Sequence, residues 1–228
     1  ARRPDRLRLP PADPGLPEGV DAAPTLALLN AGKRSVAIDL QQAEGVALAL
    51  RLIDRADAVV ESFAPGALAR LGLAPDALLA RRPALIVLST SLFGQTGPQC
   101  DHPGSGGHAS ALAGFHHLTG WPDREALGPR VAVTDSLSPR YAAALLAAAL
   151  LERAETGRGQ HLDVSQVEVG VHALSELVVR WTAAGESLGR DGNRDERAAP
   201  HGVYPCDGED AWIAIAAPDD AAWAALVA

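Results

Sequence analysis

The first two-thirds of the chain alternates short apolar runs with longer amphipathic stretches. Several apolar runs of four or five residues are rich in valine, isoleucine and leucine, which is typical of buried strands. Helix-prone stretches separate them, and this alternation predicts a parallel sheet with right-handed helical crossovers. The expected strands are residues 35–38, 58–61 and 85–89, and the expected helices between them are residues 43–56, 66–71 and 75–82.

The pattern continues with more helix beyond residue 100. The glycine-rich residues 103–107 open a helix that we expect to run to about His117, and residues 130–134 predict a short strand that stops at Asp135. Ser138 is expected to cap a long alanine-rich helix, with Pro139 at its favoured first position. The further expected elements are a strand at 161–164, a helix at 166–184, antiparallel strands at 203–204 and 212–215, and a helix at 219–228.

These elements predict an α/β protein with a parallel Rossmann-like sheet, flanking helices and an incomplete small α+β domain. We expect residues 1–24 to be an irregular connector, residues 25–185 to form the large domain, and residues 186–228 to begin the small one. The chain starts with Ala1 and contains no methionine, so it is expected to be a piece of a longer chain.

The predicted sheet also indicates where a ligand would bind. In open parallel sheets, ligands bind beyond the carboxyl ends of the strands. Each of the loops at residues 39–42, 61–66 and 90–107 comes at the carboxyl end of a predicted strand. We therefore expect these three loops to line a site.

Composition narrows the function classes. The net charge of −8 gives no electrostatic footprint for nucleic acid. No apolar run approaches the roughly 20 residues of a membrane span. The two cysteines, Cys100 and Cys206, are far apart and have no metal-ligand spacing, so we expect neither a disulfide framework nor a metal site. A reducing, cytoplasmic location is the resulting expectation.

Five segments in order resemble the family III CoA-transferases, the group that contains formyl-CoA transferase and carnitine CoA-transferase. Single segments would be weak evidence, but their common order and spacing are specific. The resemblance covers roughly residues 25–228. Its segments are residues 30–40 with 44–45, 56–66 with 71–73, 91–98, 156–165, and 192–194 with 199–205.

The resemblance implies more than the pattern alone does. It implies that the family's first β-α unit is missing at the front and that much of the small domain is missing at the back. It also implies an interlocked homodimer or a complementing chain as partner, acyl-CoA and a small carboxylic acid as substrates, and no tightly bound cofactor.

Asp135 matches the position of the family's nucleophilic aspartate. The resemblance implies that its carboxylate attacks an acyl-CoA thioester, giving a mixed anhydride and then an aspartyl-CoA thioester. Such an anhydride must be kept from water. The alternative from the residues alone is a helix cap, because an aspartate just before a helix commonly accepts backbone N–H bonds.

The resemblance also places the CoA contacts. Arg70 would be the partner of a CoA phosphate or ribose, with a solvated helix arginine as the alternative. Many members carry an aromatic-acidic pair where this chain has Ser105 and Gly106, and often an arginine in place of Ala64. The implied CoA-binding residues are Ile38, Asp39, Leu40, Gln41, Ser62, Phe63, Ala64, Arg70, Pro103, Gly104, Ser105 and Gly106.

Two other functions stay open. An α-methylacyl-CoA racemase needs a histidine and an aspartate as acid/base groups. The histidine position of that group falls on Ser105, and His108, about one helical turn on, is expected to point elsewhere. His116 and His117 are expected to be helix-end residues, and His201 is a weak candidate for binding the acid. The chain could also be a catalytically incomplete subunit or fragment.

Overall fold

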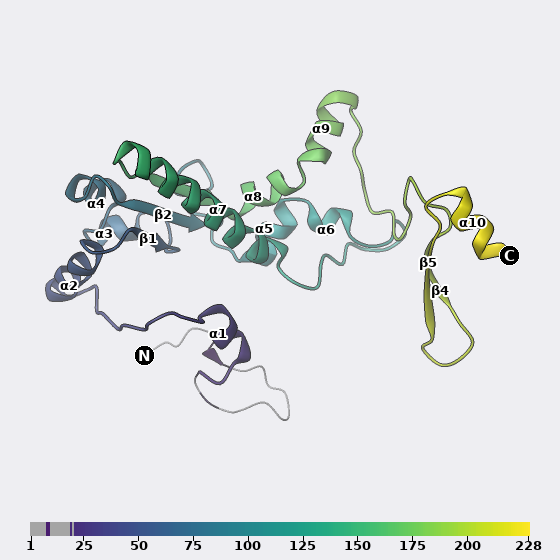
Figure 1. The fold of residues 1–228 in the computed structure, drawn as a ribbon, viewed down its shortest axis with the longest axis horizontal. Helices are drawn as coiled ribbons and strands as arrows, with labels where there is room; N and C mark the ends of the chain where they lie inside the picture. Colours follow the sequence, from purple (N-terminus) through teal and green to yellow (C-terminus); the bar gives the residue numbers. More distant parts are fainter. Residues whose placement is uncertain (1–7, 10–18, 20) are drawn as a thin grey trace. The chain divides into compact units, whose positions relative to one another are not determined.

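The computed structural model describes residues 8–9, 19 and 21–228 (Figure 1). Residue contacts divide the chain into two units, Ala1–Asp39 and Leu40–Ala228. The first unit contains helix α1, Pro24–Leu29. The strand predicted at residues 35–38 is wrong. A strand needs a neighbour to pair its backbone, and no described residue pairs with this segment, in which Val36 is 66% exposed. The predicted connector lies largely outside the described residues.

The second unit is built on a three-stranded parallel sheet. Its strands are β1 (Ala58–Glu61), β2 (Ile86–Ser91) and β3 (His161–Ser165), in the order β1-β2-β3. The register pairs Val59 with Val87 and Leu88 with Leu162. These strands confirm the predictions at 58–61, 85–89 and 161–164, and the parallel α/β class.

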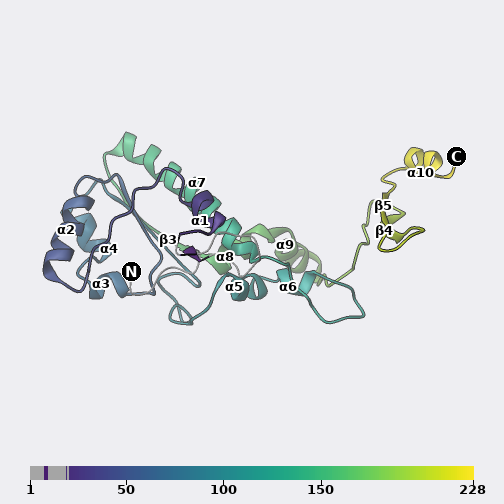
Figure 2. The same cartoon turned by 90° about the horizontal axis from the view of Figure 1, so that it is seen from below.

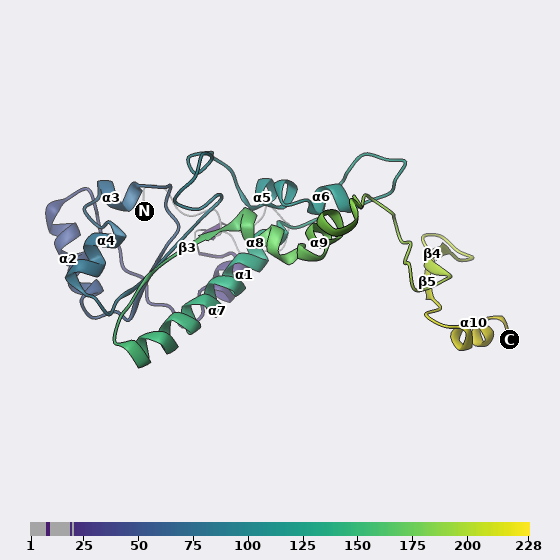
Figure 3. The same cartoon turned by 90° about the horizontal axis from the view of Figure 1, so that it is seen from above.

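Helices cover both faces of this sheet (Figure 3). On one face lie α2 (Ala43–Ile53), α3 (Ala67–Arg70) and α4 (Pro75–Arg81), and on the other lies the long helix α7 (Val133–Thr156). Because side chains alternate along a strand, Val87 packs among the first group and Leu88 packs against α7. Each face therefore has its own apolar cluster, with β2 buried between them.

Two of the expected helices are interrupted. The glycine-rich start opens α5 (Gly106–Leu112), and α6 (Phe115–Leu118) follows only after Gly114, whose φ of +108° no continuing helix tolerates. The helix expected at 166–184 is likewise divided at Leu174 into α8 (Gln166–Ala173) and α9 (Ser175–Ala184).

The start of α7 differs from the prediction. The strand expected at 130–134 is wrong: α7 already begins at Val133, and no strand of the described residues lies beside this segment. Ser138 is therefore not a cap, but is buried in the helix with a hydroxyl that has no partner among the described residues. Pro139 lies inside the helix, and its missing N–H leaves the Asp135 carbonyl without its usual helical donor.

The last part of the chain forms an antiparallel pair and a helix. The pair is β4 (His201–Pro205) with β5 (Trp212–Ala216), as predicted. Helix α10 (Asp220–Val227) follows, and the Asp219 carboxylate caps it by accepting the N–H of Ala222 at 2.7 Å. In the part of the chain that the structure describes, no helix is long and apolar enough to cross a membrane.

Candidate functional site

Asp135 lies in the first turn of α7, with an exposed side chain. The residue before the helix is Ala132, and no side chain caps this end. The simple cap alternative for Asp135 is therefore wrong, because its carboxylate bonds to another side chain and not to the backbone of its own helix. The N-terminus of a 24-residue helix still favours its negative charge.

Gly106 brings the start of α5 directly against this carboxylate. A Cβ atom at position 106 would lie 2.0 Å from Asp135 Oδ1 and 2.3 Å from Cγ, so a side chain there would displace the carboxylate. Gly106 is buried, whereas Asp135 is exposed. The glycine therefore makes room for the carboxylate in its present position, and no unusual backbone angle is involved.

Gln166 supplies the hydrogen bond to Asp135. Its Nε2 donates to Asp135 Oδ1 over 3.1 Å, from the first residue of α8. The first turns of three helices, α5, α7 and α8, thus meet at one carboxylate. Figures 2 and 3 show these helices packed side by side near the sheet.

A buried set of hydroxyls fixes α5 on α7. Thr134 Oγ1 donates to the Gly106 carbonyl at 2.9 Å and lies 3.2 Å from Ser110 Oγ, which also accepts the Thr134 N–H at 3.3 Å. Thr134 and Ser110 are both fully buried. These hydrogen bonds hold Thr134, which precedes Asp135, to Gly106, which faces the Asp135 carboxylate.

The arrangement lies beyond the carboxyl ends of two strands. Helix α8 begins directly after β3, and the loop that follows β2 leads to α5. The two ends are joined at Leu92, whose carbonyl accepts from Ser165 Oγ at 3.2 Å and from the Val167 N–H at 3.1 Å. The loop expected at 90–107 therefore does reach the candidate nucleophile.

Ser105 and His108 form a capping pair at the start of α5. His108 Nδ1 accepts the Ser105 N–H at 3.1 Å and lies 3.0 Å from Ser105 Oγ. The expectation that His108 points elsewhere is wrong, because the capping geometry folds its ring back over the helix start. Pro103 and Gly104 are exposed just before it, and a Cβ on Gly104 would lie 2.4 Å from Leu92 Cδ2.

A second group of predicted residues gathers where β1 ends. Ser62, Phe63 and Ala64 are all exposed there, and the Phe63 N–H bonds to Glu61 Oε2 at 2.8 Å. Arg70 folds back from α3, with Nη1 3.3 Å from where a Cβ of Gly66 would be. Arg70 forms no ion pair with the described residues, which leaves its guanidinium available to an anion.

The remaining predicted CoA residues span the boundary between the two units. Ile38 and Asp39 end the first unit, and Leu40 and Gln41 begin the second. Leu40 packs against the apolar cluster formed with α2, α3 and α4. The role of all four residues in binding CoA stays a prediction.

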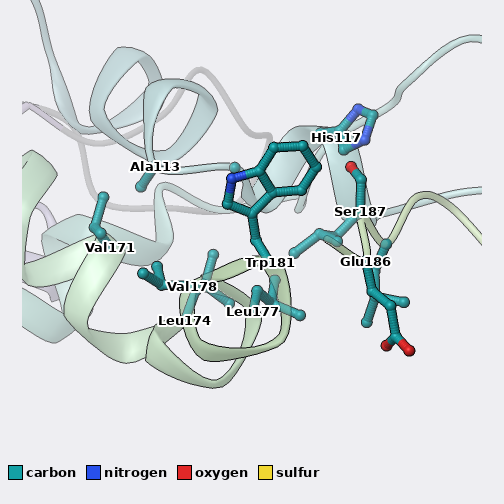
Figure 4. Close-up of a pocket in the computed structure, with 12 residues that line it drawn as sticks. Ala113, His117, Val171, Leu174, Leu177, Val178, Trp181, Glu186 and Ser187 are labelled. Atoms are coloured by element: carbon teal, nitrogen blue, oxygen red, sulfur yellow. The ribbon is translucent and has the colours of Figure 1, made fainter. Parts of the chain in front are cut away.

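Two features escaped the sequence reasoning. One is Gln166, which belongs to no catalytic motif. The other is an apolar cavity of about 190 Å³ between α6, α8 and α9. Figure 4 shows Trp181 standing between Val178 and His117 in this cavity. His116 and His117 lie in the last turn of α6, which fits the prediction of helix-end residues. His201 begins β4 with Nδ1 2.5 Å from the Asn193 carbonyl oxygen.

The chain also matches a known protein family. Residues 2–228 match the model of "CoA-transferase family III". The chain belongs to CoA-transferase family III. Among curated members of the family, it is 38% identical over 194 residues to the succinyl-CoA–D-citramalate CoA-transferase of Chloroflexus aurantiacus, covering 85% of this chain and 48% of that one.

Two further relatives extend the comparison. The chain is 35% identical to the succinate–glutarate CoA-transferase of Agrobacterium fabrum, covering 84% of this chain and 47% of that one. A crystal structure of a CAIB/BAIF family protein from Brucella suis aligns with a TM-score of 0.86 at 32% identity, covering 96% of this chain and 58% of that one. This family III chain thus spans about half the length of the curated relatives it matches.

Proposed function

We propose that the protein transfers coenzyme A from an acyl-CoA donor to a carboxylic acid, with Asp135 as the nucleophile. The observation that carries the proposal is the placement of the Asp135 carboxylate. The carboxylate is exposed, and it lies at the start of a long helix beyond the carboxyl ends of two parallel strands. Gly106 has no side chain, so its backbone can lie close to one side of the carboxylate.

The first half of the reaction loads the aspartate. An oxygen of the Asp135 carboxylate attacks the thioester carbonyl of the donor, the C–S bond breaks, and CoA leaves as its thiolate. The thiolate then attacks Cγ of the mixed anhydride, which releases the donor acid as a carboxylate and leaves CoA on Asp135 as a thioester. No proton is consumed and no oxidant is needed.

The second half reverses these steps with a different acid. The acceptor carboxylate attacks Cγ of the aspartyl-CoA thioester and displaces the thiolate, giving a second anhydride. The thiolate attacks the acceptor's carbonyl carbon, so that acyl-CoA forms and the Asp135 carboxylate is restored. The site must exclude water during both anhydride stages.

The CoA moiety would bind along the ends of the strands. Arg70 would meet a phosphate, because an unpaired guanidinium suits phosphate oxygens. The backbone of Pro103 to Gly106 would lie along the pantetheine arm, with Ser62, Phe63 and Ala64 on the adjacent strand end. The family resemblance alone supports CoA contacts at Ile38, Asp39, Leu40 and Gln41. The proposed partner is a second copy of the chain or a complementing chain.

An activity assay tests the nucleophile. Asp135→Asn in the protein as it is encoded should lower CoA transfer by about 10⁴-fold or more, because the amide cannot form the anhydride. The relatives' names suggest succinyl-CoA with D-citramalate, and the acids succinate and glutarate, as the first substrates to assay. Asp76→Asn is the matched control, since Asp76 also lies in the first turn of a helix. Undiminished transfer by Asp135→Asn would contradict the proposal.

One observation keeps the racemase as a second candidate. The imidazole of His108 reaches Ser105, the position at which that reaction would need its histidine. A racemase would exchange the α-hydrogen of a 2-methylacyl-CoA with deuterated water when no acceptor acid is present. Exchange without transfer would favour racemisation, and transfer without exchange would favour the CoA-transferase.

A further inference from the structure

Gln166 is the hydrogen-bond partner of the Asp135 carboxylate within the described residues. The 3.1 Å contact joins its Nε2 to Oδ1. A carboxylate has no proton to donate, so the NH₂ end of the amide, and not its oxygen, must face Asp135. The two residues are 31 positions apart, and their contact depends on how α8 packs on α7.

The backbone around Gln166 is fixed by contacts of the residue before it and by buried residues after it. The side chain of Ser165 accepts the N–H of Glu168 at 3.2 Å and donates to the Leu92 carbonyl, which fixes the first turn of α8. Val169 and Gly170 are buried one turn later. The amide thus projects from a rigid element, as an oriented catalytic donor requires.

We propose that Gln166 is a catalytic hydrogen-bond donor that stabilises the oxyanion formed on Asp135 itself. This inference rests on the proposed role of Asp135 as nucleophile. Oδ1 is held by Gln166, so Oδ2 is the oxygen that attacks the acyl group. When CoA thiolate then attacks Cγ, the donor acid leaves with Oδ2, and Oδ1 remains as the carbonyl oxygen of the aspartyl-CoA thioester.

Negative charge develops on Oδ1 in two of the four addition steps. Both the attack of CoA thiolate on the anhydride and the attack of the acceptor acid on the thioester add to Cγ and convert Oδ1 into an oxyanion. The Gln166 amide is already placed at this atom, and its hydrogen bond strengthens as the charge grows. In the other two steps the charge develops on the acyl oxygen, which Gln166 does not contact.

A purely structural role explains the amide less well. The first position of a helix needs no glutamine, and the cap of α8 is supplied by Ser165. The Gln166 side chain forms no other hydrogen bond with the described residues. Its one contact is with the reacting carboxylate.

The test separates the thioester step from the rest of the cycle. Protein is incubated with succinyl-CoA, freed of excess substrate, and mixed with an acceptor acid, and the loss of CoA mass from Asp135 is followed over time. Gln166→Leu and Gln166→Glu should discharge the thioester about 100-fold more slowly than the unmodified protein. Gln166→Asn, which keeps a donor, should recover part of that loss.

Gln160→Leu is the matched control. The Gln160 amide also donates to a carboxylate, Glu152 Oε2 at 2.8 Å, but it lies at the opposite end of β3. Its discharge rate should be unchanged, and thermal unfolding shows whether each variant is folded. Discharge by Gln166→Leu at the unmodified rate would overturn the inference and leave Asp135 in place. Absence of any CoA on Asp135 in the unmodified protein would instead overturn both proposals.

Discussion

The two ends of the parallel sheet use glycine and polar groups for different purposes. At the amino end, a Cβ on Gly159 would lie 1.7 Å from the Leu85 carbonyl oxygen, so backbone packs on backbone. The Gly159 N–H bonds to the Pro83 carbonyl at 2.7 Å. Arginines complete this end, with Arg82 donating to the carbonyls of Ile53, Asp54 and Ala56, and Arg153 to those of Asp57 and Ala84.

At the carboxyl end, the space beside glycine is taken by a side chain. The Asp135 carboxylate fills the position that a Cβ of Gly106 would occupy. Buried polar atoms at this end, Ser91 Oγ and Gln95 Nε2, have no hydrogen-bond partner among the described residues. The difference teaches that one end of the sheet is closed by backbone and arginine contacts, whereas the other has polar side chains without partners among the described residues, as the proposed site requires.

The largest expected effect comes from filling the space at the amino end. Gly159→Ala forces a methyl group into the Leu85 carbonyl, so β2 and β3 must move apart. We expect a loss of about 3 kcal/mol in the free energy of unfolding, measured by urea denaturation. The control is Gly157→Ala, where a Cβ meets no atom within 4 Å and only the positive φ of +70° is strained. Equal losses in the two variants would show that the contact of Gly159 with the Leu85 carbonyl does not stabilise the amino end.

Filling the space at the carboxyl end should affect activity more than stability. Gly106→Ala displaces a flexible carboxylate instead of backbone, so Asp135 must leave its contact with Gln166. A nucleophile misplaced by about 1 Å costs roughly 100-fold in rate, and we expect that loss in transfer activity at a nearly unchanged midpoint of denaturation.

The next residue of the same helix provides the control for this variant. A Cβ on Gly107 would meet only Ser105 Oγ, at 3.9 Å. Gly107→Ala should therefore keep far more activity than Gly106→Ala. A Gly106→Ala protein as active as Gly107→Ala would show that the contact with Asp135 does not matter.

The smallest effect is expected at the hydroxyls that join α5 to α7. Ser110→Ala removes the acceptor of the buried Thr134 N–H and leaves it without that partner. We expect a loss of about 1 to 2 kcal/mol in the free energy of unfolding. The comparison variant is Ala109→Ser, which adds at the neighbouring residue the one oxygen atom that Ser110→Ala removes. Its hydroxyl would be buried at a position that is apolar and fully buried. A Ser110→Ala protein of unchanged stability would contradict the role given to this hydroxyl.

The sequence predicted the sheet better than it predicted the helix starts. Strands 58–61 and 85–89 are short apolar runs, and in strand 161–164 the apolar Leu162 and Val164 alternate with polar residues. Such patterns need little tertiary information. The start of α7 was misplaced because Ser138 and Pro139 together form a strong local start signal. Burial of Thr134 against α5 outweighs that signal and begins the helix at Val133.

The candidate site was predictable only in part. Ordered motifs indicated Asp135 and Gly106, but the reason for the glycine is a contact between residues 29 positions apart. The sequence does not indicate a role for Gln166, because a glutamine after a strand is common. Its contact with Asp135 depends on how α8 packs on α7. The segment at 35–38 was expected as a strand from its β-branched residues, although a strand also requires a neighbour.

The most direct test of the central claim is the mass of the peptide that contains Asp135. The protein is incubated with an acyl-CoA in the absence of any acceptor acid, quenched, digested and analysed by mass spectrometry. We expect the mass of CoA, bound through a thioester, on Asp135, and none in the Asp135→Asn variant. CoA transfer at full rate without this adduct, or with the adduct on another residue, would contradict the account.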